Sequence, residues 1–127
     1  MFNILIADDD VDAWFRVNAL LRRYLVKASF VTNFSAARQW VDKQMPSVLF
    51  FDKQLQDQSS IDFIRYVRLK YPDVKIVMVD NYGEGSMGFR SRADLNISKP
   101  FIPEVIERTI VKLLFPQLQE FQPAQSV

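Results

Sequence analysis

Three apolar stretches of this 127-residue chain each lead into aspartate. They read ILIADDD at Ile4–Asp10, VLFFDKQL at Val48–Leu55 and IVMVDN at Ile76–Asn81. Carboxylates that are brought together repel one another unless a cation, a proton or a lysine compensates their charge. A magnesium ion in an open site, held by two or three oxygens and shared with a phosphate, is the simplest compensation. The question is whether the fold brings the three acidic ends to one place.

The apolar pattern predicts five strands that alternate with helices. Apolar runs of strand length occur at Phe2–Ala7, Ser29–Thr32, Val48–Phe51, Val74–Val79 and Leu95–Ser98. Apolar residues at helical spacing occur at Trp14–Tyr24, Ala36–Val41, Ile61–Val67 and Ile102–Leu113. Continuously apolar strands are typical of a sheet that is buried on both faces. Together with the alternation of strand and helix, this predicts an α/β fold, a doubly wound sheet of five parallel strands with helices on both faces.

In such sheets the ligand binds outside the carboxyl ends of the strands. The acids expected to project there are Asp8, Asp9, Asp52 and Asp80. Lys99, in ISKPF just after the fifth strand, would arrive at the same edge and offer a donor to an anionic oxygen. The predicted topology therefore gathers four acids and one lysine at one edge of the sheet.

Two segments depart from the regular pattern. Residues 81–91, NYGEGSMGFRS, hold all three glycines of the chain. Because glycine costs about 1 kcal/mol relative to alanine in a helix interior, we expect a short, late or mobile helix there. Residues 116–127 carry prolines and glutamines without periodicity, and we interpret them as a linker-like or frayed C-terminal tail after a domain of residues 1–115.

Several other residues have structural explanations. Asp10 and Asp12 are expected to begin and cap the first helix, where acids favour the positive end of the helix dipole. Trp14 and Trp40 lie at helical spacing with other apolar residues, so we expect them in or beside the core rather than in a cofactor site. Asp57 is expected to be a solvated loop acid.

The composition excludes several classes of function. Lysine and arginine number 16 and aspartate and glutamate 15, so the formal net charge of +1 gives no global field that would draw the chain to nucleic acid or anionic lipid. The chain has no cysteine and no histidine, so a metal site must use carboxylate and carbonyl oxygens. No apolar run approaches the roughly 20 residues of a membrane helix, and the N-terminal run lacks a basic leader. We therefore expect a cytoplasmic protein without a nucleic acid or membrane partner.

The chain resembles a response-regulator receiver domain of the CheY-like type, the receiving module of two-component phosphorelay signal transduction. The resemblance rests on the acidic pair Asp8–Asp9 after the first strand and on Asp52 after the third. It also rests on Lys99–Pro100–Phe101 after the fifth strand, preceded by Ala93–Asp94. It covers residues 3 to about 115 and implies the flavodoxin-like fold.

The resemblance also implies roles for these residues. Asp52 would be the phosphoacceptor, taking a phosphoryl group from the phosphohistidine of a sensor histidine kinase or phosphotransfer protein. Asp9, Asp52 and the backbone carbonyl of Gln54 would ligate Mg²⁺, with Asp8 acting directly or through water. Lys99 would pair with the acceptor and then with a phosphoryl oxygen. Such a domain is not itself an enzyme, and a chain without histidine is not the phosphohistidine donor.

Receiver domains also offer a partner surface. The face formed by the fourth helix, the fifth strand and the last helix is the usual site for an output domain or for self-association. In this chain it coincides with the least regular stretch, so we expect its partner recognition to be individual.

The chain departs from the family at four places. Asp80 stands where the family has threonine or serine, Asn96 where it usually has an aromatic residue, Gln56 where proline is common, and Ser59–Ser60 where Asp-Gly is common. In the family the hydroxyl moves to hydrogen-bond the phosphoryl group and the aromatic ring turns inward behind it. An ionised carboxylate only accepts hydrogen bonds, so it cannot replace that hydroxyl as a donor. Asp80 and Asn96 are therefore atypical switch positions.

Charge counting gives the same result. The four strand-end acids, Lys99 and one Mg²⁺ carry a net charge of −1, where a typical site with three acids would reach 0. Two unit charges ~4 Å apart repel by about 4 kcal/mol at an effective dielectric constant of 20. We therefore predict that phosphoryl uptake is weakened and that the threonine-aromatic switch is absent.

Two other functions stay open. A pseudo-receiver would use the same fold as a phosphorylation-independent protein-interaction module. A magnesium-dependent phosphatase of the haloacid dehalogenase type would use Asp8 rather than Asp52 as its nucleophile. A calcium-binding EF-hand at Asp8–Ala19 is excluded because its sixth and twelfth positions are alanines, not glycine and glutamate.

Overall fold

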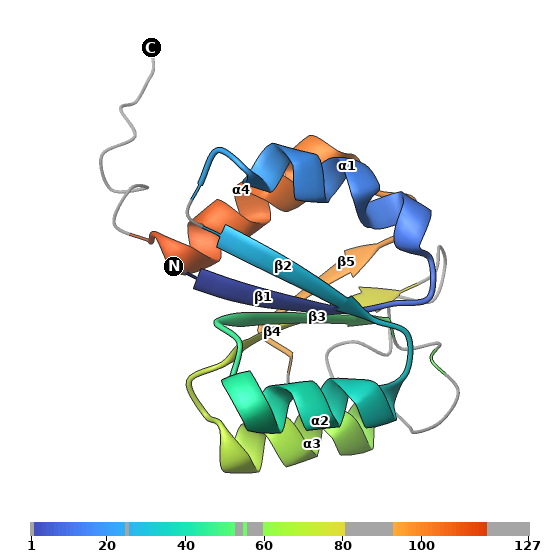
Figure 1. Cartoon of the computed structure of the whole chain (residues 1–127), viewed down its shortest axis with the longest axis vertical. Helices are drawn as coiled ribbons and strands as arrows, with labels where there is room; N and C mark the ends of the chain where they lie inside the picture. The colour runs from blue at the N-terminus through green and yellow to red at the C-terminus, as the bar shows by residue number, and fades with distance from the viewer. Residues whose placement is uncertain (1, 25, 53–54, 56–59, 81–92, 117–127) are drawn as a thin grey trace.

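The computed structural model describes residues 2–24, 26–52, 55, 60–80 and 93–116. The strands are β1 (Phe2–Ala7), β2 (Val26–Val31), β3 (Val48–Asp52), β4 (Lys75–Asp80) and β5 (Leu95–Ser98). The helices are α1 (Val11–Leu21), α2 (Phe34–Gln44), α3 (Ser60–Lys70) and α4 (Pro103–Leu114). They form three layers, with α1 and α4 on one face of the sheet and α2 and α3 on the other (Figure 1).

The five strands are all parallel and lie in the order β2-β1-β3-β4-β5. The order reverses at β1, because β2 lies on one side of β1 and β3 on the other. A ligand site of a doubly wound sheet lies at such a reversal, outside the carboxyl ends of the strands. The predicted fold is therefore confirmed, and its natural binding site is at the ends of β1 and β3.

The sheet is buried on both faces, which explains the continuous apolar runs. Residues along each strand alternate between the two faces. Leu5 and Leu49 pack in the core beneath α2 and α3, whereas Ile6 and Phe50 pack in the core beneath α1 and α4. All five residues of β3 are buried. The strand that carries Asp52 is thus fixed from both sides.

The helix ends follow from local sequence. Asp10 caps α1, accepting a hydrogen bond from the backbone nitrogen of Ala13 at 3.3 Å, as predicted. Asn33 caps α2 in the same way through Ala36, at 2.7 Å. Pro103 begins α4, where its missing N–H costs no helical hydrogen bond. Local sequence therefore accounts for where α1, α2 and α4 begin.

Several predicted boundaries were wrong. The second strand starts at Val26 rather than Ser29, because β2 is an edge strand and the exposed Lys27 interrupts its apolar pattern. Asp52 and Asp80 are the last residues of β3 and β4, not the first residues after them. Ile61, one of the apolar residues whose spacing predicts the third helix, is exposed.

The irregular helix predicted at residues 81–91 lies outside the described residues, as does all of the predicted tail except Pro116. The same holds for four residues named in the sequence analysis: Gln54, Gln56, Asp57 and Ser59. Nothing in the helices that the structure describes has the length and apolar character needed to cross a membrane.

Candidate functional site

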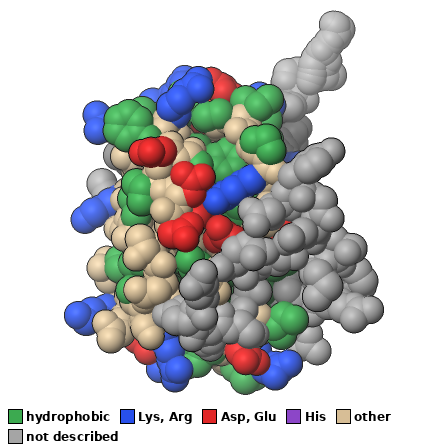
Figure 2. Space-filling view, turned by 90° about the vertical axis from the view of Figure 1, so that its right-hand side faces the viewer, with side chains coloured by type: hydrophobic (Ala, Val, Ile, Leu, Met, Phe, Trp, Pro, Cys, Tyr) green, Lys and Arg blue, Asp and Glu red, His purple; other side chains and the backbone are tan. Residues whose placement is uncertain are grey.

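Three acids meet at the carboxyl edge of β1 and β3. Asp8, Asp9 and Asp52 each offer one carboxylate oxygen, and these oxygens lie within 4.8 Å of one another. Figure 2 looks onto this edge and shows acidic side chains gathered around a basic one. Asp8 and Asp52 are 1% and 4% exposed, whereas Asp9 is exposed. The structure therefore brings together the three acids that the sequence predicts as metal ligands.

The alternation along the strands explains why Asp8 and Asp52 face each other. Ile6 and Phe50 point into the core beneath α1 and α4. Asp8 and Asp52 each lie two residues further on, so they project to that same face. β1 and β3 are paired in register, with Ile6 opposite Phe50, which brings their ends level.

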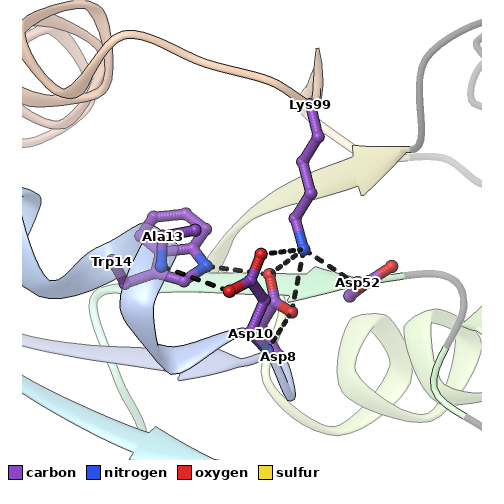
Figure 3. A network of polar contacts seen from close by, with 6 residues as sticks. All are labelled: Asp8, Asp10, Ala13, Trp14, Asp52 and Lys99. Carbon is purple, nitrogen blue, oxygen red and sulfur yellow. Dashed lines mark hydrogen bonds and ion pairs between the residues drawn. The ribbon is translucent and has the colours of Figure 1, made fainter.

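Lys99 connects the acids (Figure 3). Its Nζ lies 3.0 Å from Asp8 Oδ1, 2.9 Å from Asp8 Oδ2 and 3.4 Å from Asp52 Oδ2. Burial lowers the pKa of Lys99, but the hydrogen bonds and charges of Asp8 and Asp52 outweigh this effect and raise the pKa above its ordinary value of 10.5. Lys99 is therefore held as an ammonium ion between the two buried carboxylates.

Asp8 accepts two further hydrogen bonds. The backbone nitrogen of Asp10 donates to Oδ1 at 3.0 Å, and the indole Nε1 of Trp14 donates to Oδ2 at 2.8 Å. Both oxygens of Asp8 are therefore held by named donors. Trp14 is a core residue, as predicted, but its bond to Asp8 was not predicted. A signal was available, because a buried indole N–H needs an acceptor and Trp14 lies on the helix that follows the acidic pair.

Asp10 has a second contact that sequence reasoning missed. Besides capping α1, its Oδ2 lies 3.8 Å from Lys99 Nζ. The side chain is largely exposed, so this ion pair is weaker than those of Lys99 with Asp8 and Asp52. Asp10 adds negative charge to the mouth of the site.

Asp80 and Asn96 lie on the other face of the sheet. Ile76 and Met78 of β4 pack beneath α2 and α3, and the alternation places Asp80 on that side. Asn96 is paired with Met78 in β5 and is exposed. Asp80 is 1% exposed, and among the described residues it is not a member of the group within 4.8 Å. The sheet edge is therefore shared, but the predicted switch positions and the acid group occupy opposite faces.

The family model of the response regulator receiver domain matches residues 4–111. The chain belongs to this family. It is 28% identical over 127 residues to the transcriptional regulatory protein CssR of Bacillus subtilis (strain 168), covering 95% of this chain and 54% of that protein. The chain thus spans about half the length of this curated relative. It is a response regulator receiver domain of a two-component system, as its sequence indicates.

Solved receiver domains have the same fold. A CheY-like receiver domain protein from Methanospirillum hungatei JF-1 matches with a TM-score of 0.80 at 21% identity, covering 94% of this chain and 98% of that one. A putative response regulator from Chloroflexus aurantiacus J-10-fl matches with a TM-score of 0.78 at 23% identity, covering 88% and 96%. At these identities the likeness establishes the flavodoxin-like fold alone.

The acid group of this receiver domain fits a hard divalent cation. Carboxylate oxygens suit magnesium, which keeps several waters and is held by one or two carboxylates together with phosphate. Asp8, Asp9 and Asp52 supply such oxygens at one edge. Asp9 is exposed, so at least one of these carboxylates is open to solvent.

Proposed function

We propose that this receiver domain accepts a phosphoryl group on Asp52, with Mg²⁺ held by Asp8, Asp9, Asp52 and the backbone carbonyl of Gln54. The observation that supports this most directly is the position of Lys99, whose ammonium group lies 3.4 Å from Asp52 Oδ2. A cation beside a buried acceptor carboxylate, within a group of acids, is the arrangement that phosphoryl transfer requires.

The donor is the phosphohistidine of a sensor histidine kinase or a phosphotransfer protein. A carboxylate oxygen of Asp52 attacks phosphorus, the new O–P bond forms as the P–N bond breaks, and the imidazole keeps the electron pair. The transition state is loose and places charge on the three equatorial oxygens, so positioning and charge compensation supply most of the catalysis. Mg²⁺, when bound, supplies positive charge for those oxygens. Lys99 supplies a second positive charge, and its raised pKa means that it stays protonated at neutral pH.

Asp80 weakens this uptake. A phosphoryl group adds a charge of about −1.5 to −2, and Asp80 is a fourth acid, buried at the same edge of the sheet. Its carboxylate cannot donate a hydrogen bond to the phosphoryl group when ionised. Asn96, exposed on β5, has no aromatic ring to turn inward. The domain therefore takes up phosphate less completely than a typical receiver and lacks the threonine-aromatic switch.

The partners follow from this role. The relative CssR is named a transcriptional regulatory protein and is about twice as long as the aligned region. We infer an output domain for the whole protein, or self-association through the face of β5, α4 and the segment before β5. The domain acts as a cytoplasmic signalling module without turnover of its own.

The pseudo-receiver is the second candidate. Asp80 and Asn96 favour it, because both replace the residues that report phosphorylation. The phosphatase with Asp8 as nucleophile is disfavoured, because both oxygens of Asp8 are already engaged by Lys99, Trp14 and the backbone of Asp10.

Intact-mass analysis after incubation with acetyl phosphate tests the proposal. Wild type should gain one phosphoryl group only when magnesium is present, and Asp52→Asn should gain none. Asp73→Asn, at an exposed acid before β4, is the matched control and should behave as wild type. Phosphoryl uptake that survives in Asp52→Asn would contradict the assignment. Absence of uptake in wild type at saturating donor and magnesium would favour the pseudo-receiver.

A further inference from the structure

The indole N–H of Trp14 donates a hydrogen bond to Asp8, a carboxylate of the site, from a fully buried position. The indole is 0% exposed, and its Nε1 lies 2.8 Å from Asp8 Oδ2 (Figure 3). Water cannot replace this acceptor, because the ring has no access to solvent. The hydrogen bond is therefore a fixed part of the folded site.

The ring itself is positioned by the two segments that carry the other site residues. It packs against Phe50, two residues before Asp52, with ring centroids 5.1 Å apart. It also packs against Phe101, two residues after Lys99, with centroids 4.8 Å apart. The direction of the indole N–H is thus set by β3 and by the segment after β5. Through its hydrogen bond, the indole in turn fixes the orientation of the Asp8 carboxylate.

The bond restricts how Asp8 meets a cation. Oδ2 accepts from Trp14, whereas Oδ1 accepts from the backbone of Asp10, and Lys99 lies near both oxygens. With Oδ2 tied to a rigid ring and Oδ1 tied to the backbone of Asp10, both oxygens face Lys99 Nζ, which occupies the position where one ion would bind the two oxygens together. While Lys99 holds that position, Asp8 can offer an ion one oxygen, or act through a water. Magnesium accepts that mode, whereas calcium takes six to eight oxygens and often binds carboxylates bidentately.

We propose that Trp14 is a positioning residue that sets the orientation of Asp8 and thereby favours Mg²⁺ over Ca²⁺ at the acid group. The inference rests on the proposed magnesium binding and adds to it the residue that governs ion preference. The indole touches neither the ion nor the phosphoryl group and acts through Asp8 alone. Outer-shell partners of this kind typically change metal affinity by 10–100-fold when they are removed.

The test compares Trp14→Phe with wild type by isothermal titration of Mg²⁺ and, separately, Ca²⁺. Phenylalanine keeps an aromatic ring in the core but removes the N–H donor. Mg²⁺ affinity should fall by about tenfold, and Ca²⁺ affinity should fall less, so the preference for Mg²⁺ narrows. Trp40→Phe is the matched control: Trp40 is partly buried against the core beneath α2 and α3, so neither affinity should change. Equal losses for both ions, or no loss, would overturn the inference.

A second measurement does not depend on the stability of Trp14→Phe, because it is made in Trp40→Phe, where Trp14 is intact. In Trp40→Phe, Trp14 supplies the single indole N–H resonance. That resonance should exchange slowly with solvent and shift on Mg²⁺ addition in step with calorimetric saturation. A resonance that stays still during saturation would also overturn the inference. Wild type that binds no Mg²⁺ would overturn the proposed metal site, whereas normal Mg²⁺ binding with an unaffected Trp14→Phe overturns the role of Trp14 alone.

Discussion

The two halves of the sheet's carboxyl edge hold their polar residues in different ways. At β1 and β3, Asp8 and Asp52 project to the α1 and α4 face and share Lys99 between them. At β4 and β5, Asp80 and Asn96 project to the α2 and α3 face, one buried and the other exposed. The first half gathers the residues that the sequence predicts for phosphoryl chemistry, and the second half carries the two predicted switch positions.

The pleat of the sheet makes this division possible. Side chains on opposite faces of a sheet pack into different cores, so substitutions on one face leave the packing of the other largely intact. The group around Lys99 is built from β1, β3 and the end of β5, with Trp14 of α1 behind it. Among the described residues, Asp80 is not a member of the group of Asp8, Asp9 and Asp52. Uptake geometry and switch geometry can therefore change separately.

Removing Lys99 should give the largest effect. Lys99→Met leaves Asp8 and Asp52 buried without their shared ammonium, and removing one partner of a buried ion pair costs about 3–5 kcal/mol. We expect a loss of about 3 kcal/mol in the free energy of unfolding, measured by urea denaturation in magnesium-free buffer, together with loss of phosphoryl uptake. Added Mg²⁺ should restore part of the stability, because a cation again compensates the acids. Lys75→Met, at an exposed lysine where β4 begins, should leave both properties unchanged.

The pH dependence sharpens this prediction. Since the pKa of Lys99 is raised on folding, its contribution is complete below the unfolded value of about 10.5 and is lost as pH rises through the higher folded pKa. The stability difference between wild type and Lys99→Met should therefore be constant from pH 7 to 9.5 and shrink only above about 10.5. A difference that shrinks near neutral pH would mean that Lys99 is not held by the two carboxylates.

Changing Asp80 should have a smaller effect, of opposite sign. Asp80→Asn removes the fourth charge and keeps the shape, and Asp80→Thr also provides a hydroxyl donor. A repulsion of only about 1.4 kcal/mol corresponds to a tenfold change in equilibrium, so both variants should raise the phosphorylated fraction about tenfold at limiting acetyl phosphate. The phosphorylated fraction should be higher in Asp80→Thr than in Asp80→Asn if a hydrogen bond donated to the phosphoryl group matters as well as the charge. Phosphoryl uptake that is unchanged in both variants would show that the charge of Asp80 does not weaken phosphorylation of Asp52.

Much of this site could be predicted from sequence, because strand-end acids follow from apolar runs and from parallel topology. Asp8, Asp9, Asp52 and Lys99 meet as their order along the chain predicts. The face occupied by Asp80 could not be assigned in advance, because the fourth strand was predicted to stop one residue early, at Val79. Counting the alternation through Asp80 requires knowing that the residue belongs to the strand.

The hydrogen bond from Trp14 to Asp8 could not be predicted from the sequence for a different reason. Helical spacing places Trp14 on the buried face of α1 but does not say where its N–H points. That direction depends on Phe50 and Phe101, which approach the ring from segments far away in the sequence. The start of β2 was missed because an edge strand needs fewer apolar residues than a central one.

The smallest predicted effect lies on the face of α2 and α3. Asp42 accepts hydrogen bonds from the hydroxyls of Tyr66 and Tyr71 and pairs with Lys70, and these contacts lower its pKa below 3.8. A carboxylate whose pKa is lowered on folding stabilises above its unfolded pKa, and that contribution is lost as pH falls through the lower folded value. Asp42→Asn should therefore cause a slight loss of stability near pH 7 that begins to shrink below about pH 3.8 and vanishes as pH falls through the lower folded pKa, as measured by thermal melts across this range. Mg²⁺ affinity and phosphoryl uptake should stay at wild-type levels, because the cluster lies across the sheet from Asp8 and Asp52. A change in either would show that the contacts of Asp42 on the α2 and α3 face are coupled to the acid group of Asp8, Asp9 and Asp52.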